Sequence, residues 1–251
     1  MKTWMKRTAF LSASISLLSI TPAYAQWTSL ATLEEAKTAY ENLSDVDLTY
    51  NLDAKEAHQN YDLESEMDMS VKAVQKNSPS NLKLYMDVSM SSLGSRIYYN
   101  TYYENGYSYV DWMGTKTRSA VSSEEAQSQV ASFTNLMYTD KEWYDRIVYW
   151  EKDGNKIVTF DLADDKLQET AEPLIEMLMI NQEGREVTVN EVTGEYVMDS
   201  QGNPSQITIA AEMNMVRETD VYTLDMNAQL QLYNPGQPVE LPSVNLDEYS
   251  V

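Results

Sequence analysis

"LKLYMDVSM", residues 82–90, alternates apolar and polar side chains over its whole length. Successive side chains of a β-strand point to opposite faces, so Leu84, Met86, Val88 and Met90 would share one face of a sheet. The same alternation recurs in segments at residues 46–52, 63–73, 205–217 and 220–233. This pattern is typical of an antiparallel sheet with one covered face and one solvated face.

Turn residues indicate how the strands connect. Asn105-Gly106 and Asp153-Gly154 are dipeptides that favour positive φ at both positions of a tight hairpin turn. The strands expected around them lie near residues 96–103, 107–113, 143–151 and 156–162, and "TKTR" at 115–118 is expected to start another. A final meander of three strands is expected near residues 186–199, 205–217 and 220–233.

Three segments have apolar residues at helical spacing instead, at residues 27–44, 122–138 and 164–181. Ser122 and Glu125 are spaced as a capping box at the start of the second. Pro173 lies inside the third and is expected to kink that helix or to split it in two. The tail after residue 233 contains three prolines, which predict an extended run along the surface or the sheet edge.

Strands therefore outnumber helices, and hairpins provide most of the connections. The predicted fold class is α+β, with one large, curved antiparallel sheet, an incomplete β-barrel, and a few helices that cover its concave face. We expect a single domain of this kind over residues 26–251.

The first 25 residues have the composition of a secretory signal peptide. Three basic residues precede a mostly apolar stretch at residues 8–20, and Ala23-Tyr24-Ala25 places small residues at a cleavage site. About 13 such residues are too few for a helix to cross roughly 30 Å of hydrocarbon. We therefore expect cleavage after Ala25, a secreted or extracytoplasmic location in the cell envelope, and no transmembrane segment in the mature chain.

The charge of the expected mature chain restricts its partners. It carries 15 basic and 39 acidic residues, a net charge near −24, because three of the 18 Lys and Arg lie in the leader. Such a surface repels phosphate polymers and anionic lipid, so nucleic acid is not an expected partner. The chain has no cysteine, which excludes disulfides although the expected compartment would permit them.

Residue patterns for catalysis or metal binding are scarce. His58 is the single histidine and is expected to be an exposed or a turn residue, which leaves no ligand set for a typical zinc site and no base for a serine triad. No phosphate-binding glycine loop and no EF-hand pattern is present, and carboxylates are too common here to indicate a glycosidase. The sequence therefore predicts a protein that is not an enzyme and holds no metal or cofactor.

Methionine takes the place of branched aliphatic residues on several predicted strands. Seven methionines fall on faces expected to point inward, and Met137, Met177 and Met179 fall on predicted helices that could pack over them. Methionine is unbranched and polarisable, so a wall of it suits a pocket for flexible apolar guests, although it also fills ordinary cores. The candidate ligand-binding residues are Met67, Met69, Met86, Met90, Met213, Met215, Met226, Tyr99 and Tyr103.

The hairpin around Asn105-Gly106 is rich in aromatic residues, namely Tyr98, Tyr99, Tyr102, Tyr103, Tyr107, Tyr109 and Trp112. Cross-strand packing explains such a cluster. A stacking surface for a sugar or a peptide is the alternative, because tyrosines at consecutive positions place rings on both faces of the hairpin.

The order of these segments resembles the LolA-like and LppX-like half-barrel family of lipoprotein-localisation proteins, close to uncharacterised lipoproteins of Firmicutes. The resemblance rests on the first helix, on strands such as "LESEMDMSVKAV", on the hairpin "NGYSYVDWMGTKTR" and on the ending "VELPSV", and covers roughly residues 27–246. It implies an incomplete barrel around helices, with the space between them carrying a lipid or an acyl chain. The lipobox cysteine of that family is absent here, so we expect release or retention by other means.

Two functions fit these observations. The first is a secreted, non-enzymatic binding protein that holds a hydrophobic ligand, such as a lipid or an acyl chain, between sheet and helices. The alternative is an extracytoplasmic protein-interaction or glycan-contacting module with a filled core and no small ligand. The sequence identifies neither the ligand nor a protein partner.

Overall fold

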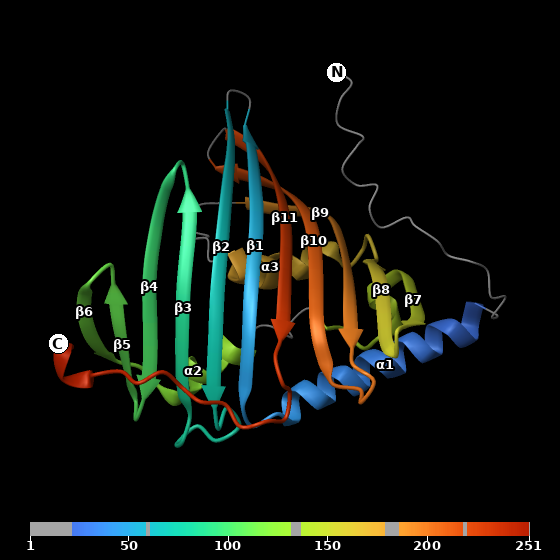
Figure 1. Cartoon of the computed structure of the whole chain (residues 1–251). Helices are drawn as coiled ribbons and strands as arrows, with labels where there is room; N and C mark the ends of the chain where they lie inside the picture. The colour runs from blue at the N-terminus through green and yellow to red at the C-terminus, as the bar shows by residue number, and fades with distance from the viewer. Residues whose placement is uncertain (1–21, 59–60, 132–136, 179–185, 218–219, 251) are drawn as a thin grey trace.

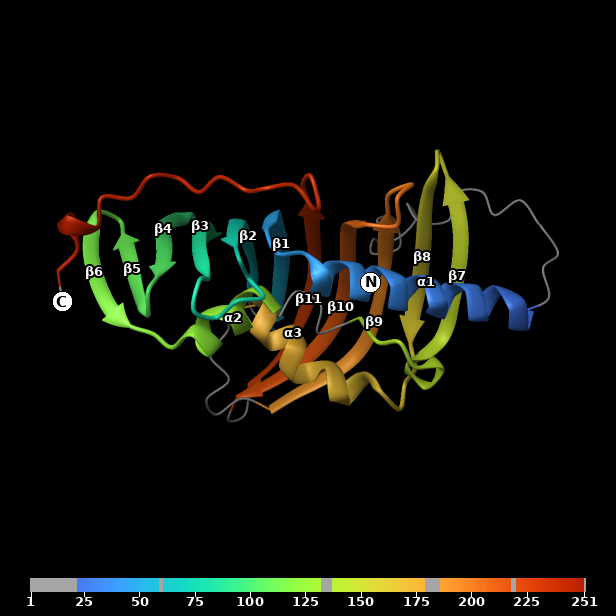
Figure 2. The ribbon, with the colours of Figure 1, turned by 90° about the horizontal axis from the view of Figure 1, so that it is seen from below.

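The computed structural model describes residues 22–58, 61–131, 137–178, 186–217 and 220–250. In these residues, eleven strands form one antiparallel sheet that is curved and open, and the helices lie on its concave side (Figure 1, Figure 2). The predicted fold class is confirmed. The curvature follows from the right-handed twist of each strand, which accumulates across many neighbours.

The strands fall into two runs along the chain. The first run is β1 (Val46–His58), β2 (Tyr61–Val74), β3 (Lys83–Ser92), β4 (Ser95–Glu104), β5 (Tyr107–Trp112) and β6 (Thr115–Ala120). The second is β7 (Tyr144–Lys152), β8 (Asn155–Leu162), β9 (Glu186–Met198), β10 (Pro204–Arg217) and β11 (Asp220–Leu232). Consecutive strands pair within each run, and the first strand, β1, pairs with the last, β11, so that the two runs meet at the centre of the sheet.

The helices bury one stripe of side chains each against the concave face. α1 (Pro22–Asn42) packs against β7, β8 and β10, α2 (Ser123–Ala131) follows β6, and α3 (Ala171–Leu178) lies against β9. Leu33, Ala36 and Tyr40 of α1 recur at helical spacing and are buried. The Tyr40 hydroxyl donates to the Val130 carbonyl oxygen at 3.0 Å, which ties α1 to α2.

The third helical segment, which contains Pro173, is split in two, and this is one of the two outcomes that the sequence predicted. A 3-10 helix, η4 (Leu167–Thr170), comes first, and α3 then begins at Ala171. Pro173 therefore lies in the first turn of α3, where its missing N–H removes no helical hydrogen bond. Met177 lies in α3, whereas Met179 lies outside the described residues.

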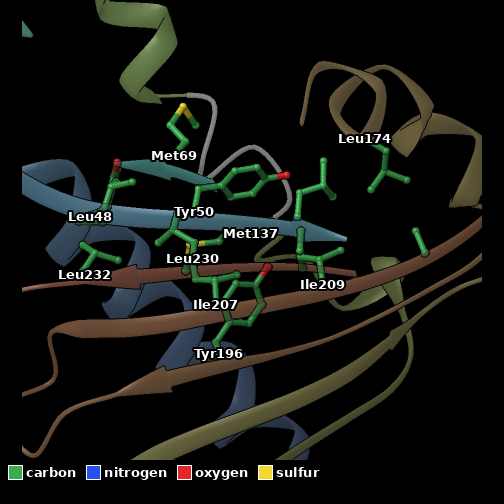
Figure 3. Packing of buried hydrophobic residues seen from close by; sticks show 14 of the residues in the cluster. Leu48, Tyr50, Met69, Met137, Leu174, Tyr196, Ile207, Ile209, Leu230 and Leu232 are labelled. Atoms are coloured by element: carbon green, nitrogen blue, oxygen red, sulfur yellow. The ribbon is translucent and has the colours of Figure 1, made fainter. Parts of the chain in front are cut away.

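The sheet register aligns one residue from each of ten neighbouring strands in a row across the concave face. From β5 to β7 the row reads Trp112, Tyr99, Val88, Met69, Tyr50, Leu230, Ile207, Tyr196, Val158 and Tyr149. Every member is aliphatic, aromatic or a methionine, as the alternation of the sequence predicts. Figure 3 shows part of this core, in which Leu174 of α3 faces the side chains of the sheet.

Some element bounds differ from the sequence-based expectations. β1 continues past its expected end at Leu52 to His58, because it pairs along its length with both β2 and β11. His58 lies in β1 and is half-buried, with its ring centroid 5.2 Å from that of Tyr222, so the expectation of an exposed or a turn histidine is wrong. Met137 is buried but lies outside any helix, so its expected helical position is wrong as well.

The proline-containing tail runs along the sheet as predicted. After β11 it passes the ends of β1 to β5 and reaches the edge strand β6 (Figure 1). The Tyr233 N–H donates to the Asp47 carbonyl oxygen at 2.8 Å, and the Arg118 N–H of β6 donates to the Ser250 carbonyl oxygen at 2.7 Å. Lys116 pairs with Glu248 of the short 3-10 helix η5 (Leu246–Glu248). The tail thereby satisfies part of an otherwise open sheet edge.

Candidate functional site

All nine candidate residues lie on the concave face, in two groups separated by β1. The group on β2, β3 and β4 is Met67, Met69, Met86, Met90, Tyr99 and Tyr103, and the group on β10 and β11 is Met213, Met215 and Met226. Direct pairs such as Met67 with Met90 connect neighbouring strands within the first group. The shared face follows from the period of two along each strand.

Six of the nine are buried in the core of the protein. Met67, Met69, Met213, Met215, Met226 and Tyr103 are each no more than 4% exposed. They belong to one cluster with aliphatic and aromatic residues of the helices and of the central strands. In this structure they fill the space under the helices, which is the ordinary role of methionine in an irregular core.

The other three, Met86, Met90 and Tyr99, are half-buried and border a more open part of the concave face. Three further apolar residues adjoin them in register: Met90 pairs with Ile97, Tyr99 pairs with Trp112, and Val110 shares the row of Met86 through Thr101. We call Met86, Met90, Ile97, Tyr99, Val110 and Trp112 the β3–β5 patch.

The aromatic rings of the β3–β5 patch are ordered by stacking. The ring centroids of Tyr99 and Trp112 lie 5.3 Å apart with an interplanar angle of 18°, and Trp112 is 47% exposed. Burial raises the pKa of the Tyr99 hydroxyl, which therefore stays neutral at neutral pH. The patch is thus an uncharged surface of adaptable thioethers beside flat rings, which suits an apolar guest.

Sequence reasoning missed Ile97 and Val110 as members of this surface and treated Trp112 only as part of the aromatic hairpin. The signal that identifies them is the register of the Asn105-Gly106 turn, which opposes Tyr99 to Trp112 and Thr101 to Val110. Counting back from a two-residue turn fixes each cross-strand pair.

A separate cleft of about 550 Å³ lies where the end of α1, α2, the β2–β3 turn and residues 137–143 meet. Its lining includes Lys37, Lys76, Gln127, Tyr138 and Trp143. The rings of Tyr138 and Trp143 are parallel, with centroids 3.6 Å apart. Burial raises the pKa of Tyr138 to about 12.

Lys76 gives this cleft a buried cation, and burial lowers the pKa of its ammonium group. The ammonium donates to the Glu41 carbonyl oxygen at 3.0 Å and to Asn77 Oδ1 at 3.1 Å, and lies 5.1 Å from the centre of the Tyr40 ring. Carbonyl oxygens at the end of a helix attract a cation. Lys76 therefore closes the end of α1, and its role here is structural.

The described residues hold no group of three His, Asp or Glu side chains placed to bind a metal ion. Within the same ranges, no helix is both long enough and apolar enough to span a membrane.

A family model, "Family of unknown function (DUF6612)", matches residues 29–249. The chain belongs to DUF6612. The DUF6612 match covers most of the first helix, the whole sheet and most of the tail. A comparison with curated proteins gave no match.

Solved structures similar to this DUF6612 chain include LprF from Mycobacterium bovis and the lipoprotein LppX from Mycobacterium tuberculosis. LprF has a TM-score of 0.48 and 12% identity, with 86% of this chain and 96% of LprF covered. LppX has a TM-score of 0.41 and 11% identity, with 86% of this chain and 98% of LppX covered. A putative outer membrane lipoprotein-sorting protein domain from Vibrio parahaemolyticus has a TM-score of 0.22 and 11% identity, with 83% and 94% covered. At this identity, nothing about ligands or partners carries over from these proteins.

Proposed function

We propose that this DUF6612 chain is an exported, non-enzymatic binding protein that holds a hydrophobic ligand, a lipid or an acyl chain, against the β3–β5 patch. The leader at residues 1–25 would direct its export. The observation that carries the proposal is the partial exposure of the apolar side chains of the β3–β5 patch on the concave face. The candidate methionines outside this patch are all buried.

The distribution of burial supports this location for the ligand. Met213, Met215 and Met226 are buried in the core of the protein, whereas Met86 and Met90 are half-buried. Contiguous exposed apolar surface on a soluble protein usually marks a binding site. Next to the patch, the buried Met67 and Met69 of β2 would form the rigid border of the ligand site, and the half-buried Met86 and Met90 of β3 would make the contact.

Residue types in the patch support a flexible apolar ligand. Met86 and Met90 have three rotatable side-chain bonds, so they can follow a chain of varied shape. The stacked rings of Tyr99 and Trp112 form a flat boundary on the outer side. The register places the two kinds of surface on adjacent strands.

The alternative is a protein-interaction or glycan-contacting module. The specific observation in its favour is that Tyr98, Tyr107 and Trp112 are exposed on one hairpin while the methionine core beneath the helices is filled. Arg96 and Arg118 lie over the rings of Tyr98 and Tyr107, with guanidinium-to-centroid distances of 5.8 and 5.0 Å. Sugar rings and peptides stack on surfaces of this kind.

The test is mass spectrometry of the protein purified without detergent, under native conditions and then after organic extraction. We expect an added mass that extracts as lipid. A Met86→Gln/Met90→Gln variant should lose this mass, because it places amides in the patch. The matched control, Met213→Leu, changes a buried methionine at nearly constant volume and should retain the mass.

Thermal unfolding of all three proteins verifies that each is folded. The proposal fails if the wild-type protein carries no lipid and also binds no fluorescent fatty acid in titration. Retention of the ligand by the Met86→Gln/Met90→Gln variant would show that the ligand does not lie against the β3–β5 patch. Binding of the protein to an oligosaccharide on a glycan array would instead favour the glycan-contacting module.

A further inference from the structure

Two hairpin turns of the sheet have an unusual composition. In the described residues, four turns have positive φ at both central residues: Leu93-Gly94, Asn105-Gly106, Met113-Gly114 and Asp153-Gly154. Turns of this type favour Asn, Asp or Gly at the first position, because other side chains are crowded in the left-handed region. Asn105 and Asp153 follow this preference, and Leu93 and Met113 do not.

The two exceptions are also among the most exposed apolar residues of the protein. Leu93 is 82% exposed and Met113 is 65% exposed. Packing within the chain therefore does not compensate for their strained backbone. Strain that persists without a structural benefit points to a function of the side chain.

Both apolar turns lie at the same end of the sheet (Figure 1). The two polar turns lie at the opposite end, where Gly154 adjoins Ser200 of the β9–β10 turn. The Met113 N–H donates to the Tyr98 carbonyl oxygen of β4 at 3.2 Å. That contact lies four residues from Gly94, or roughly 13 Å along the strand at about 3.3 Å per residue. A flat surface that touches both turns therefore meets the strands obliquely.

The residues next to each turn repeat the same order. The segments are "LGSR" at 93–96 and "MGTK" at 113–116. In each, an apolar residue comes first and is followed by a glycine, a hydroxyl residue and a basic residue. At the second turn, the exposed Trp112 directly precedes Met113, and the exposed Tyr98 accepts the Met113 N–H on its carbonyl oxygen. Apolar tips with aromatic rings and basic side chains behind them match the layers of a lipid surface, from acyl chains to headgroups.

We propose that Leu93 and Met113 insert into the surface of a zwitterionic lipid bilayer and dock the protein on it. Two single side chains on separate turns, offset by roughly 13 Å along the strands, do not form the continuous surface of roughly 1,000 Å² that a stable protein partner requires. Lys116 pairs with Asp111 and Glu248, and the whole chain has a net charge of −21, so neutral headgroups suit this end better than anionic ones. The docking does not depend on the ligand proposed above.

The test is flotation of the purified, delipidated protein with vesicles of pure phosphatidylcholine. We expect the wild-type protein to float with the vesicles, and a Leu93→Asn/Met113→Asn variant to bind at least ten-fold more weakly. Asparagine suits the left-handed turn position, so this variant should melt no lower than the wild type. Trp150→Gln removes an exposed apolar residue from the distant strand β7 and should bind as the wild type does.

Three results would overturn the docking proposal. The first is no flotation of the wild-type protein, and the second is equal flotation of the double variant. The third is a concentration-dependent dimer that the double variant abolishes, because the turns would then join copies of the chain. Fatty-acid titration of the double variant should match the wild type, so failure of docking and failure of ligand binding are separable.

Discussion

Gly194 of β9 leaves no space for a larger side chain. A Cβ atom at this position would lie 2.4 Å from Phe160 Cζ, 2.7 Å from Phe160 Cε1 and 2.8 Å from the Thr208 carbonyl oxygen. The Phe160 ring cannot move away freely, because it stacks on Tyr196 at 5.1 Å and meets Tyr144 edge-on at 5.5 Å. We therefore predict that Gly194→Ala destabilises the protein.

The magnitude follows from two opposing effects. Overpacking of a core by one methyl group costs about 1–3 kcal/mol, and the backbone contact with Thr208 favours the upper end of that range. Alanine also reduces the conformational entropy of the unfolded chain, and this effect offsets about 0.4–1 kcal/mol of the overpacking cost. We expect a net loss of about 2 kcal/mol in the free energy of unfolding, measured by urea denaturation followed by circular dichroism.

The same substitution in a Phe160→Leu protein separates the clash with the Phe160 ring from other effects of Gly194→Ala. In a Phe160→Leu protein the ring is absent, so Gly194→Ala should cost much less than it does in the wild type. The expected coupling between the two sites is about 1–2 kcal/mol. An equal cost in both backgrounds, or a cost below about 0.5 kcal/mol in the wild type, would refute the packing argument.

Further outcomes follow from the turns, the edge hairpin and the methionines. Leu93→Asn and Met113→Asn should each raise the unfolding free energy by about 1 kcal/mol in urea denaturation, because each relieves left-handed strain. Lys83 Nζ, 2.6 Å from Glu104 Oε1, and the Tyr102 hydroxyl, 2.9 Å from Oε2, hold the pKa of Glu104 below its usual range. This contribution to stability is present above the ordinary glutamate pKa and is lost as the pH falls through the lower folded-state pKa, so the acid unfolding curve of Glu104→Gln should be less steep there. Met213→Ala should cost about 2–5 kcal/mol by thermal unfolding, and Met86→Ala clearly less, because Met213 is fully buried and Met86 is not.

The sequence was sufficient to predict the sheet because its signals are local. The alternation around Met86 and the Asn105-Gly106 turn each specify strand faces and pairs within a few residues. The pairing of β1 with β11 has no such signal, since Lys55 and Asp225 are neighbours only in the folded sheet. The extension of β1 to His58 accompanies pairing with β2 as far as Tyr61 and with β11 as far as Thr223, and periodicity alone, which carries no information on pairing partners, ended the strand at Leu52.

The candidate site was predicted only in part for a similar reason, because its burial depends on contacts between segments far apart in the sequence. Alternation placed Met213 and Met86 on the same kind of face, and it carries no information on which of them the helices cover. Burial depends on where α1 and α3 dock, a long-range property of the fold. The apolar turn residues Leu93 and Met113 were missed for the opposite reason, because their positive φ contradicts local preference.

The pairing of the first strand with the last has a consequence for folding during synthesis. β1 emerges from the ribosome early, and its second neighbour, β11, is made only near the end of the chain. Until then β1 has an unpaired edge, and such edges recruit strands from other chains. Antiparallel pairing has the same geometry within one chain and between two, so refolding at high concentration should yield dimers that have exchanged β11. Dilution before refolding should suppress them.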